Sequence, residues 1–105
     1  LFLSNGNGSF QTPIVVGTGP GPRHIIVLDF NKDQKLDLVV TNEEGKMMTV
    51  LLGDGNGHFP SRIIYQTGNN PFSLVSGDYN SDGQLDIAVL NLYDRTVSIH
   101  LNGND

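Results

Sequence analysis

The sequence predicts an all-β fold built from β-propeller blades, about two four-stranded antiparallel blades per chain. The first observation is the abundance of turn signals: 13 glycines and five prolines among 105 residues leave few stretches long enough for a helix. The second is an internal repeat with a period of 49 residues, and propeller blades have about 40–50 residues each. The third is that short apolar and β-branched runs alternate with the turns, as in a series of hairpins.

The repeat extends over nearly the whole chain. Residues 1–52 align with residues 50–101 without a gap, and 17 positions are identical. The identical residues of the first copy are Leu3, Gly6, Asn7, Gly8, Phe10, Ile14, Thr18, Gly19, Pro22, Asp29, Asn31, Asp33, Leu36, Asp37, Val40, Asn42 and Leu52. Chance does not explain such a match, so we interpret the chain as copies of one structural unit.

Each copy contains the runs expected for blade strands. We expect strands at residues 24–28, 36–41, 48–52 and 62–66, and at 72–78, 85–90 and 96–101. We expect residues 1–3 and 11–16 to be the third and fourth strands of a further blade. The chain is therefore interpreted as one domain, residues 1–105, with blade-completing strands in 1–16, a first full blade in 23–67 and a second, partial blade in 71–101.

The second copy contains a nine-residue acidic loop between its first two strands. Carboxylates at alternate positions repel one another unless a cation lies between them, and Ca²⁺ takes 6–8 oxygen ligands. Gly83 permits the positive φ of a sharp turn. The ligands that we expect are the side chains of Asp78, Asn80, Asp82 and Asp86, and the backbone carbonyl of Gln84.

The first copy repeats this loop with one change at the turn. Gln34 replaces the glycine, and holding a non-glycine residue in the left-handed region costs about 1 kcal/mol. Lys32 and Lys35 also add positive charge near the loop, so we expect a weaker site. Its ligands are the side chains of Asp29, Asn31, Asp33 and Asp37, and the backbone carbonyl of Lys35. The chain thus binds two Ca²⁺ in this interpretation.

The alternative for both loops is a polar hairpin turn without a metal. A bare turn does not require three carboxylates, and a second copy at the same repeat position makes coincidence a poorer explanation. An EF-hand would need a glutamate at its twelfth position and flanking helices. Val89 occupies that position, and the flanks are β-rich.

Composition excludes several classes of function. The net charge is −5, six of the 11 acidic residues lie in the two loops, and two Ca²⁺ would bring the charge to −1. There is no basic patch for nucleic acid and no apolar run for membrane insertion. The chain has no cysteine, which excludes disulfides and thiolate metal sites. A calcium loop of this kind favours an extracellular or cell-surface location.

The loop Asp78-Tyr79-Asn80-Ser81-Asp82-Gly83-Gln84-Leu85-Asp86 and the segment Leu51-Leu52-Gly53-Asp54-Gly55-Asn56-Gly57-His58-Phe59 resemble the FG-GAP/VCBS repeat of integrin-α-type β-propellers. The resemblance covers nearly the whole chain and implies the propeller fold and calcium binding. It implies no particular activity.

We therefore expect a non-enzymatic module for extracellular recognition or adhesion, with a glycan or a protein as ligand. Some similar propellers are lectins, and the blade connectors at residues 18–24 and 67–73 include Arg23, Asn69, Asn70 and Phe72, which suit a sugar. The alternative for the connectors is that they only join the blades. The alternatives for the whole chain are a purely structural, self-assembling propeller fragment without a ligand and, less favoured, a propeller enzyme that acts on polysaccharide. The histidines His24, His58 and His100 are expected to be ordinary strand or surface residues.

The chain also predicts a partner, which is itself. Two blades leave two apolar faces exposed, and closed propellers have about 4–8 blades. We expect a head-to-tail homo-oligomer in which residues 11–16 of one chain complete the last blade of the next, with three chains favoured over four. Residues 1–3 and 99–101 both claim the third-strand position, so one of them must give way.

Overall fold

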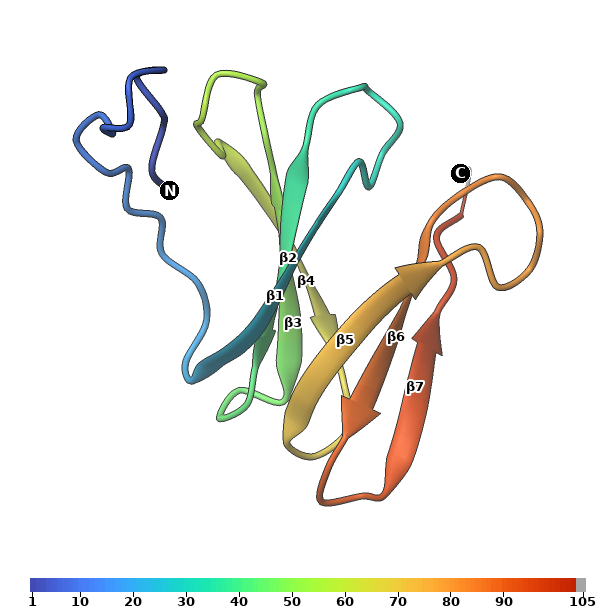
Figure 1. The fold of residues 1–105 in the computed structure, drawn as a ribbon. Coiled ribbons are helices and arrows are strands. Elements are labelled where there is room, and N and C mark those ends of the chain that lie inside the picture. Colours follow the sequence, from blue (N-terminus) through green and yellow to red (C-terminus); the bar gives the residue numbers. More distant parts are fainter. Residues whose placement is uncertain (104–105) are drawn as a thin grey trace.

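The computed structural model describes residues 1–103, which form seven strands and no helix. The first sheet consists of β1 (Pro22–Leu28), β2 (Asp37–Asn42), β3 (Met47–Leu52) and β4 (Ser61–Gln66), in that order. The second consists of β5 (Pro71–Gly77), β6 (Asp86–Asn91) and β7 (Thr96–His100) (Figure 1). The predicted all-β class, with one four-stranded and one three-stranded blade-like sheet, is confirmed. Completion of a ring by oligomerisation stays a prediction.

Neighbouring strands are antiparallel throughout and follow one another in sequence, as expected for hairpins. The two sheets share their register at the repeat offset. Leu28 pairs with Asp37 in the first sheet, and Gly77 pairs with Asp86 in the second. Every strand predicted between residues 24 and 101 is present, with each end within two residues of the prediction, because the alternation of side chains and the turn residues are local signals.

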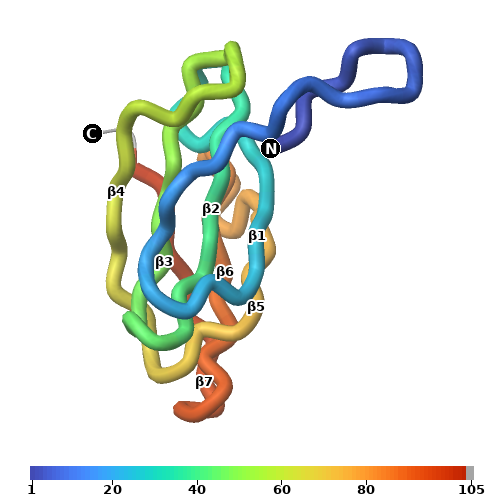
Figure 2. Tube along the Cα trace, turned by 90° about the vertical axis from the view of Figure 1, so that its left-hand side faces the viewer, coloured from blue at the N-terminus to red at the C-terminus, as the bar shows by residue number. Residues whose placement is uncertain are grey.

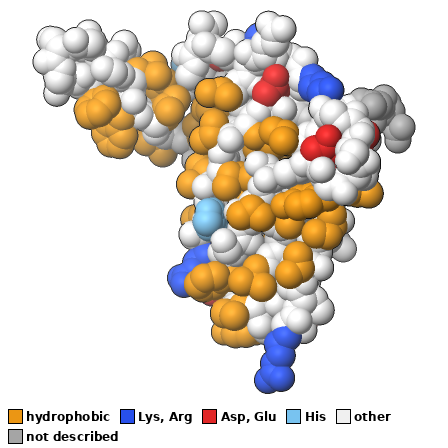
Figure 3. Space-filling model, turned by 45° about the vertical axis from the view of Figure 1, so that its right-hand side comes forward, with side chains coloured by type: hydrophobic (Ala, Val, Ile, Leu, Met, Phe, Trp, Pro, Cys, Tyr) orange, Lys and Arg blue, Asp and Glu red, His pale blue; other side chains and the backbone are white. Residues whose placement is uncertain are grey.

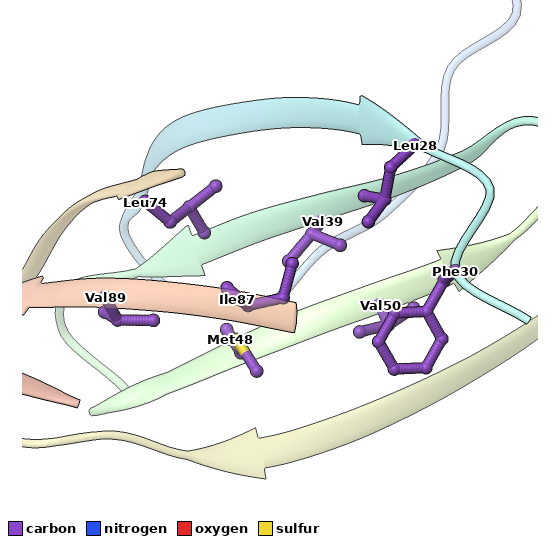
Figure 4. Packing of buried hydrophobic residues seen from close by; sticks show 8 residues of the cluster. All are labelled: Leu28, Phe30, Val39, Met48, Val50, Leu74, Ile87 and Val89. Carbon is purple, nitrogen blue, oxygen red and sulfur yellow. The ribbon is translucent and has the colours of Figure 1, made fainter. Parts of the chain in front are cut away.

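The core lies between the two sheets, which pack face to face (Figure 4). Side chains at alternate positions of a strand point to the same face. One such set of the first sheet faces the second sheet, where the residues that meet it are Leu74, Ile87 and Val89. The first sheet contributes Leu28, Val39, Met48 and Val50, together with Phe30 from the loop after β1. Burial of each aliphatic side chain stabilises the fold by about 1.5–3 kcal/mol.

The N-terminal segment differs from the prediction. Residues 1–3 and 11–16 form no strand in the chain, apart from an isolated bridge between Ser4 and Phe10. The backbones of Leu1 and Ile14 nevertheless exchange two hydrogen bonds of 2.9 Å. The ladder is short because its two arms have only each other as partners and because Pro13 has no N–H to donate. This hairpin projects from the first sheet on the side away from the second (Figures 1 and 2).

Within the described residues no helix is long and apolar enough to cross a membrane.

Candidate metal centres

The two acidic loops occupy equivalent places in the fold. The first joins β1 to β2, and the second joins β5 to β6, so both lie at the same end of the molecule (Figure 1). In the first loop, Asp29, Asp33 and Asp37 each offer a carboxylate oxygen, and these oxygens lie within 4.8 Å of one another. In the second loop, Asp78, Asp82 and Asp86 also each offer a carboxylate oxygen, and these oxygens lie within 4.8 Å of one another. The predicted carboxylates are therefore brought together in both copies.

No basic side chain among residues 1–103 forms an ion pair with either group. Within residues 1–103 the ion pair present is Arg23 with Glu43, at 3.8 Å, and it lies away from the loops. Three carboxylates in contact repel one another strongly in the absence of a cation. Hard oxygen donors at this spacing fit a divalent metal ion such as Ca²⁺.

The loops are shaped by their own first carboxylate. Asp78 accepts hydrogen bonds from the backbone N–H groups of Asp82 at 3.1 Å and Gly83 at 2.8 Å. Asp29 accepts the equivalent pair from Asp33 and Gln34 at 3.1 and 2.8 Å. The bond from the Gly83 N–H is the main reason why the pKa of Asp78 lies below its usual value. The carboxylate is thereby held in its charged, metal-binding form.

The turn geometry confirms one expectation and adds a second feature. Gln34 adopts φ 67° where Gly83 adopts φ 84°, so the first loop does hold a non-glycine residue in the left-handed region. The residues two positions earlier, Lys32 and Ser81, are also left-handed, with φ of 60° and 58°. The sequence does not predict this second left-handed residue, because neither lysine nor serine is typical of that conformation.

The last aspartate of each loop has a structural role that the sequence did not reveal. Asp86 is fully buried, and its two oxygens accept hydrogen bonds from the N–H groups of Tyr79 and Asn102 at 2.9 and 2.8 Å. Asp37 is buried in the same way and accepts from Phe30 and Gly53, both at 2.8 Å. Because the donors are backbone groups, no residue type marks them in the sequence. Each aspartate ties its loop to the segment that follows the third strand.

The remaining expected ligands lie in the same two loops. Asn31 and Asn80 are exposed, whereas Gln84 is buried and Lys35 is exposed. The backbone N–H groups of Lys35 and Gln84 donate to Asp33 and Asp82, at 3.0 and 2.9 Å. Coordination through the carbonyls of Lys35 and Gln84 and through the amides of Asn31 and Asn80 stays a prediction.

The blade connectors bring their candidate residues into contacts within the protein. The Asn69 side chain donates to Asp94 at 2.6 Å, and its backbone N–H donates to the same carboxylate at 2.8 Å. The Arg23 guanidinium lies 4.3 Å from the centre of the Phe72 ring. Asn70 is buried, and its Oδ1 has no hydrogen-bond partner among the described residues. These four residues do not form one shared pocket of free polar groups.

The three histidines lie in separate surroundings. His24 Nδ1 and Ser73 Oγ are 3.1 Å apart, and these residues occupy the same repeat position in the two blades. The His100 ring packs edge-on against Tyr65, with ring centres 6.2 Å apart. His58 follows the glycine-rich turn, where its N–H donates to Asp54. No histidine belongs to a potential metal-binding group within the described residues.

Comparison with known proteins gives a family. A family model described as an FG-GAP-like repeat matches residues 1–40 and again residues 29–89. No curated protein and no solved structure matches the chain.

Proposed function

Because the chain belongs to the FG-GAP-like repeat family, we propose that it is a calcium-binding β-propeller module that serves extracellular recognition or adhesion. The observation that carries the metal assignment is the pair of acidic groups. In each loop three carboxylate oxygens converge within 4.8 Å, without a basic partner in residues 1–103. Their hardness and number suit Ca²⁺, which prefers oxygen donors and tolerates irregular geometry.

Calcium also has a clear mechanical effect in this arrangement. The first and last aspartates of each loop are already anchored by backbone N–H groups, so an ion between them would join the loop to the segment after the third strand. An ion that binds only the folded form stabilises it by about 2.7 kcal/mol per site at 100 times its dissociation constant. Calcium is therefore proposed to act as a structural ion.

The test is a calcium titration of the metal-free chain by calorimetry, with thermal unfolding in calcium and in EGTA. Two bound ions per chain and a higher midpoint in calcium are expected. Magnesium is the matched control, because it demands a tighter octahedral shell and should shift the midpoint less. Equal midpoints in calcium and in EGTA would contradict the proposal.

The recognition role has a glycan or a protein as its ligand. The connectors support it in one respect: Arg23 and Phe72 present a charged group over an aromatic ring, half-exposed at the junction between the blades. The second candidate is a purely structural propeller unit without a ligand, which the internal engagement of Asn69 by Asp94 favours. A glycan array probed with and without calcium separates the two, since calcium-dependent binding to a sugar class is expected only for the first. We propose no catalytic activity, because within residues 1–103 no acid–base pair stands apart from the metal ligands.

A further inference from the structure

The contact between the two sheets uses opposite faces of the repeated unit. We call face A the side of a blade that carries Val39 and Val50 in the first sheet. Face B is the side that carries Ile87 and Val89 in the second. The buried cluster between the sheets consists of face A of the first sheet and face B of the second. One blade thus presents face A to the next blade's face B.

The two remaining faces carry the same repeat positions. Face A of the second sheet holds Val75, Leu90 and Val97, which are 57%, 42% and 59% exposed. Figure 3, in which the side of the second sheet comes forward, shows hydrophobic side chains gathered across it. Face B of the first sheet is exposed at Ile25 and Val27, by 53% and 57%, whereas Val40 and Leu51 on the same face are buried. At an offset of 49 residues, Val75, Val97 and Ile25 correspond to Ile26, Met48 and Leu74 of the observed interface, and Leu90 corresponds to the buried Thr41. Val27 corresponds to Ser76, which is exposed. The free face A therefore matches the free face B as a continuation of the observed interface at four of these five positions.

A cavity on face B of the first sheet supports this correspondence. It has a volume of about 510 Å³, and its lining includes Val27, Leu36, Leu38 and Gly53. Leu38 stands where Ile87 stands in the second blade, and Gly53 stands where Asn102 stands.

The equivalent place on the second blade is filled by Phe30. The Phe30 ring belongs to the same buried cluster as Ile87. The backbone carbonyl of Phe30 accepts a hydrogen bond from the Asn102 side chain. Tyr79 occupies the position of Phe30 in the second blade and is 48% exposed. Phe30 packs against the following blade, and Tyr79 has no such blade to pack against within residues 1–103.

We propose that these faces bind a second copy of the chain, head to tail, with face A of one copy on face B of the next and Tyr79 in the cavity at Leu36, Leu38 and Gly53. The proposal rests on the repeated interface and not on calcium binding. The contact is heterologous, so it either closes into a ring or continues as a filament. Three chains would give six blades and four would give eight, both within the usual range of closed propellers.

The test uses light scattering coupled to size-exclusion chromatography on the 11.4 kDa chain. We expect a particle of three or four chains. Leu90→Glu and Ile25→Glu each place a carboxylate on one free face, at positions exposed in the single chain, and each should give a folded monomer by circular dichroism. Tyr93→Glu is the matched control: Tyr93 is 75% exposed in the β6–β7 turn, and its variant should assemble like the parent.

Mixing the two interface variants gives the decisive result. The Leu90→Glu chain retains face B and the Ile25→Glu chain retains face A, so an equimolar mixture should form a one-to-one dimer and nothing larger. A parent chain that stays monomeric would overturn the proposal. A mixture that stays monomeric, or a single variant that still dimerises, would equally overturn the head-to-tail contact.

Discussion

The Nζ atom of Lys32, a residue of the first acidic loop, lies beside Gly83 of the second loop, 3.5 Å from the point where a Cβ on that glycine would stand. The positive charge that the sequence assigns to the first site therefore lies next to the second. Lys35, by contrast, runs along Gly55, with its Cγ 3.5 Å from the corresponding point there. Of the two lysines, Lys32 is therefore the one that we expect to weaken calcium binding at the second loop.

We therefore predict that Lys32→Ser raises the calcium affinity of the second site roughly two- to fivefold, the range of a single exposed charge interaction. The measurement is calorimetry in an Asp33→Ala background, where only the second site binds. Lys35→Ser removes the same charge from the chain and is the matched control. The gain should shrink as salt is raised, because exposed charges are screened. Equal gains from both lysine variants would contradict the assignment.

The buried aspartates and the exposed ones should respond differently to substitution. Asp86→Ala removes a metal ligand and also leaves the N–H groups of Tyr79 and Asn102 without an acceptor. Each such loss costs about 1–3 kcal/mol. Asp82 is exposed and accepts one hydrogen bond, from Gln84. Urea unfolding in EGTA should therefore show a large loss of stability for Asp86→Ala and little for Asp82→Ala.

In calcium, both variants should lose the contribution of the second site. Asp54→Ala is the control, since its carboxylate accepts from the backbone of Asn56 and His58 in a turn outside both loops. It should leave two calcium ions bound. Equal stability of Asp86→Ala and Asp82→Ala in EGTA would show that the buried carboxylate is not an anchor of the metal-free fold.

A third prediction concerns pH. Burial lowers the pKa of His100 from its usual value of 6.5, and its Nε2 has no hydrogen-bond partner among the described residues. Its ring packs against the uncharged ring of Tyr65. The unfolded chain therefore binds the proton more readily than the folded chain. Stability is fully present above pH 6.5 and declines as the pH falls from 6.5 toward the folded pKa.

His100→Leu should remove this part of the pH dependence, because Leu51 occupies the same position in the first blade. The measurement is the unfolding midpoint in urea from about pH 7.5 to about pH 5.5, a window that spans the ordinary histidine pKa. It is carried out in EGTA so that calcium binding does not contribute. His58→Leu is the control, as His58 lies outside the interface between the sheets, and it should keep the parent's slope. If the unfolding midpoint of the His100→Leu variant changed with pH as much as that of the parent, His100 would not be the source of this pH dependence.

The strands and the acidic loops could be predicted from the sequence because their signals are local. Side-chain alternation, turn residues and the spacing of Asp78, Asn80 and Asp82 act within a few residues. The buried role of Asp37 and the position of Lys32 beside the second loop depend instead on how separate segments meet in space. The prediction of strands at residues 1–3 and 11–16 was wrong for the single chain for a related reason. Residues 11–16 have a strand-like composition, but a strand needs a hydrogen-bonded neighbour, and the single chain offers these residues few backbone partners.

The last prediction places that neighbour in another copy of the chain. In the first blade Val50 pairs with Ile63, and Leu1 pairs with Ile14 at the same repeat positions. Ile99 occupies the position of Val50 in the last blade. In the assembly, Ile99 should displace Leu1 and pair with Ile14 of the next copy, completing the free edge of β7.

A double variant, Ile14→Cys with Ile99→Cys, tests this register, and the chain has no cysteine of its own to interfere. Hydrogen-bonded antiparallel partners have Cα atoms about 5.5 Å apart, which suits a disulfide. Mild oxidation should link the copies covalently, and closed rings would appear as trimers or tetramers on a non-reducing gel. The two single variants are the controls: a head-to-tail contact keeps identical positions of neighbouring copies apart, so neither single variant should cross-link. Cross-linking by a single variant, or none by the double variant, would rule out strand exchange in this register.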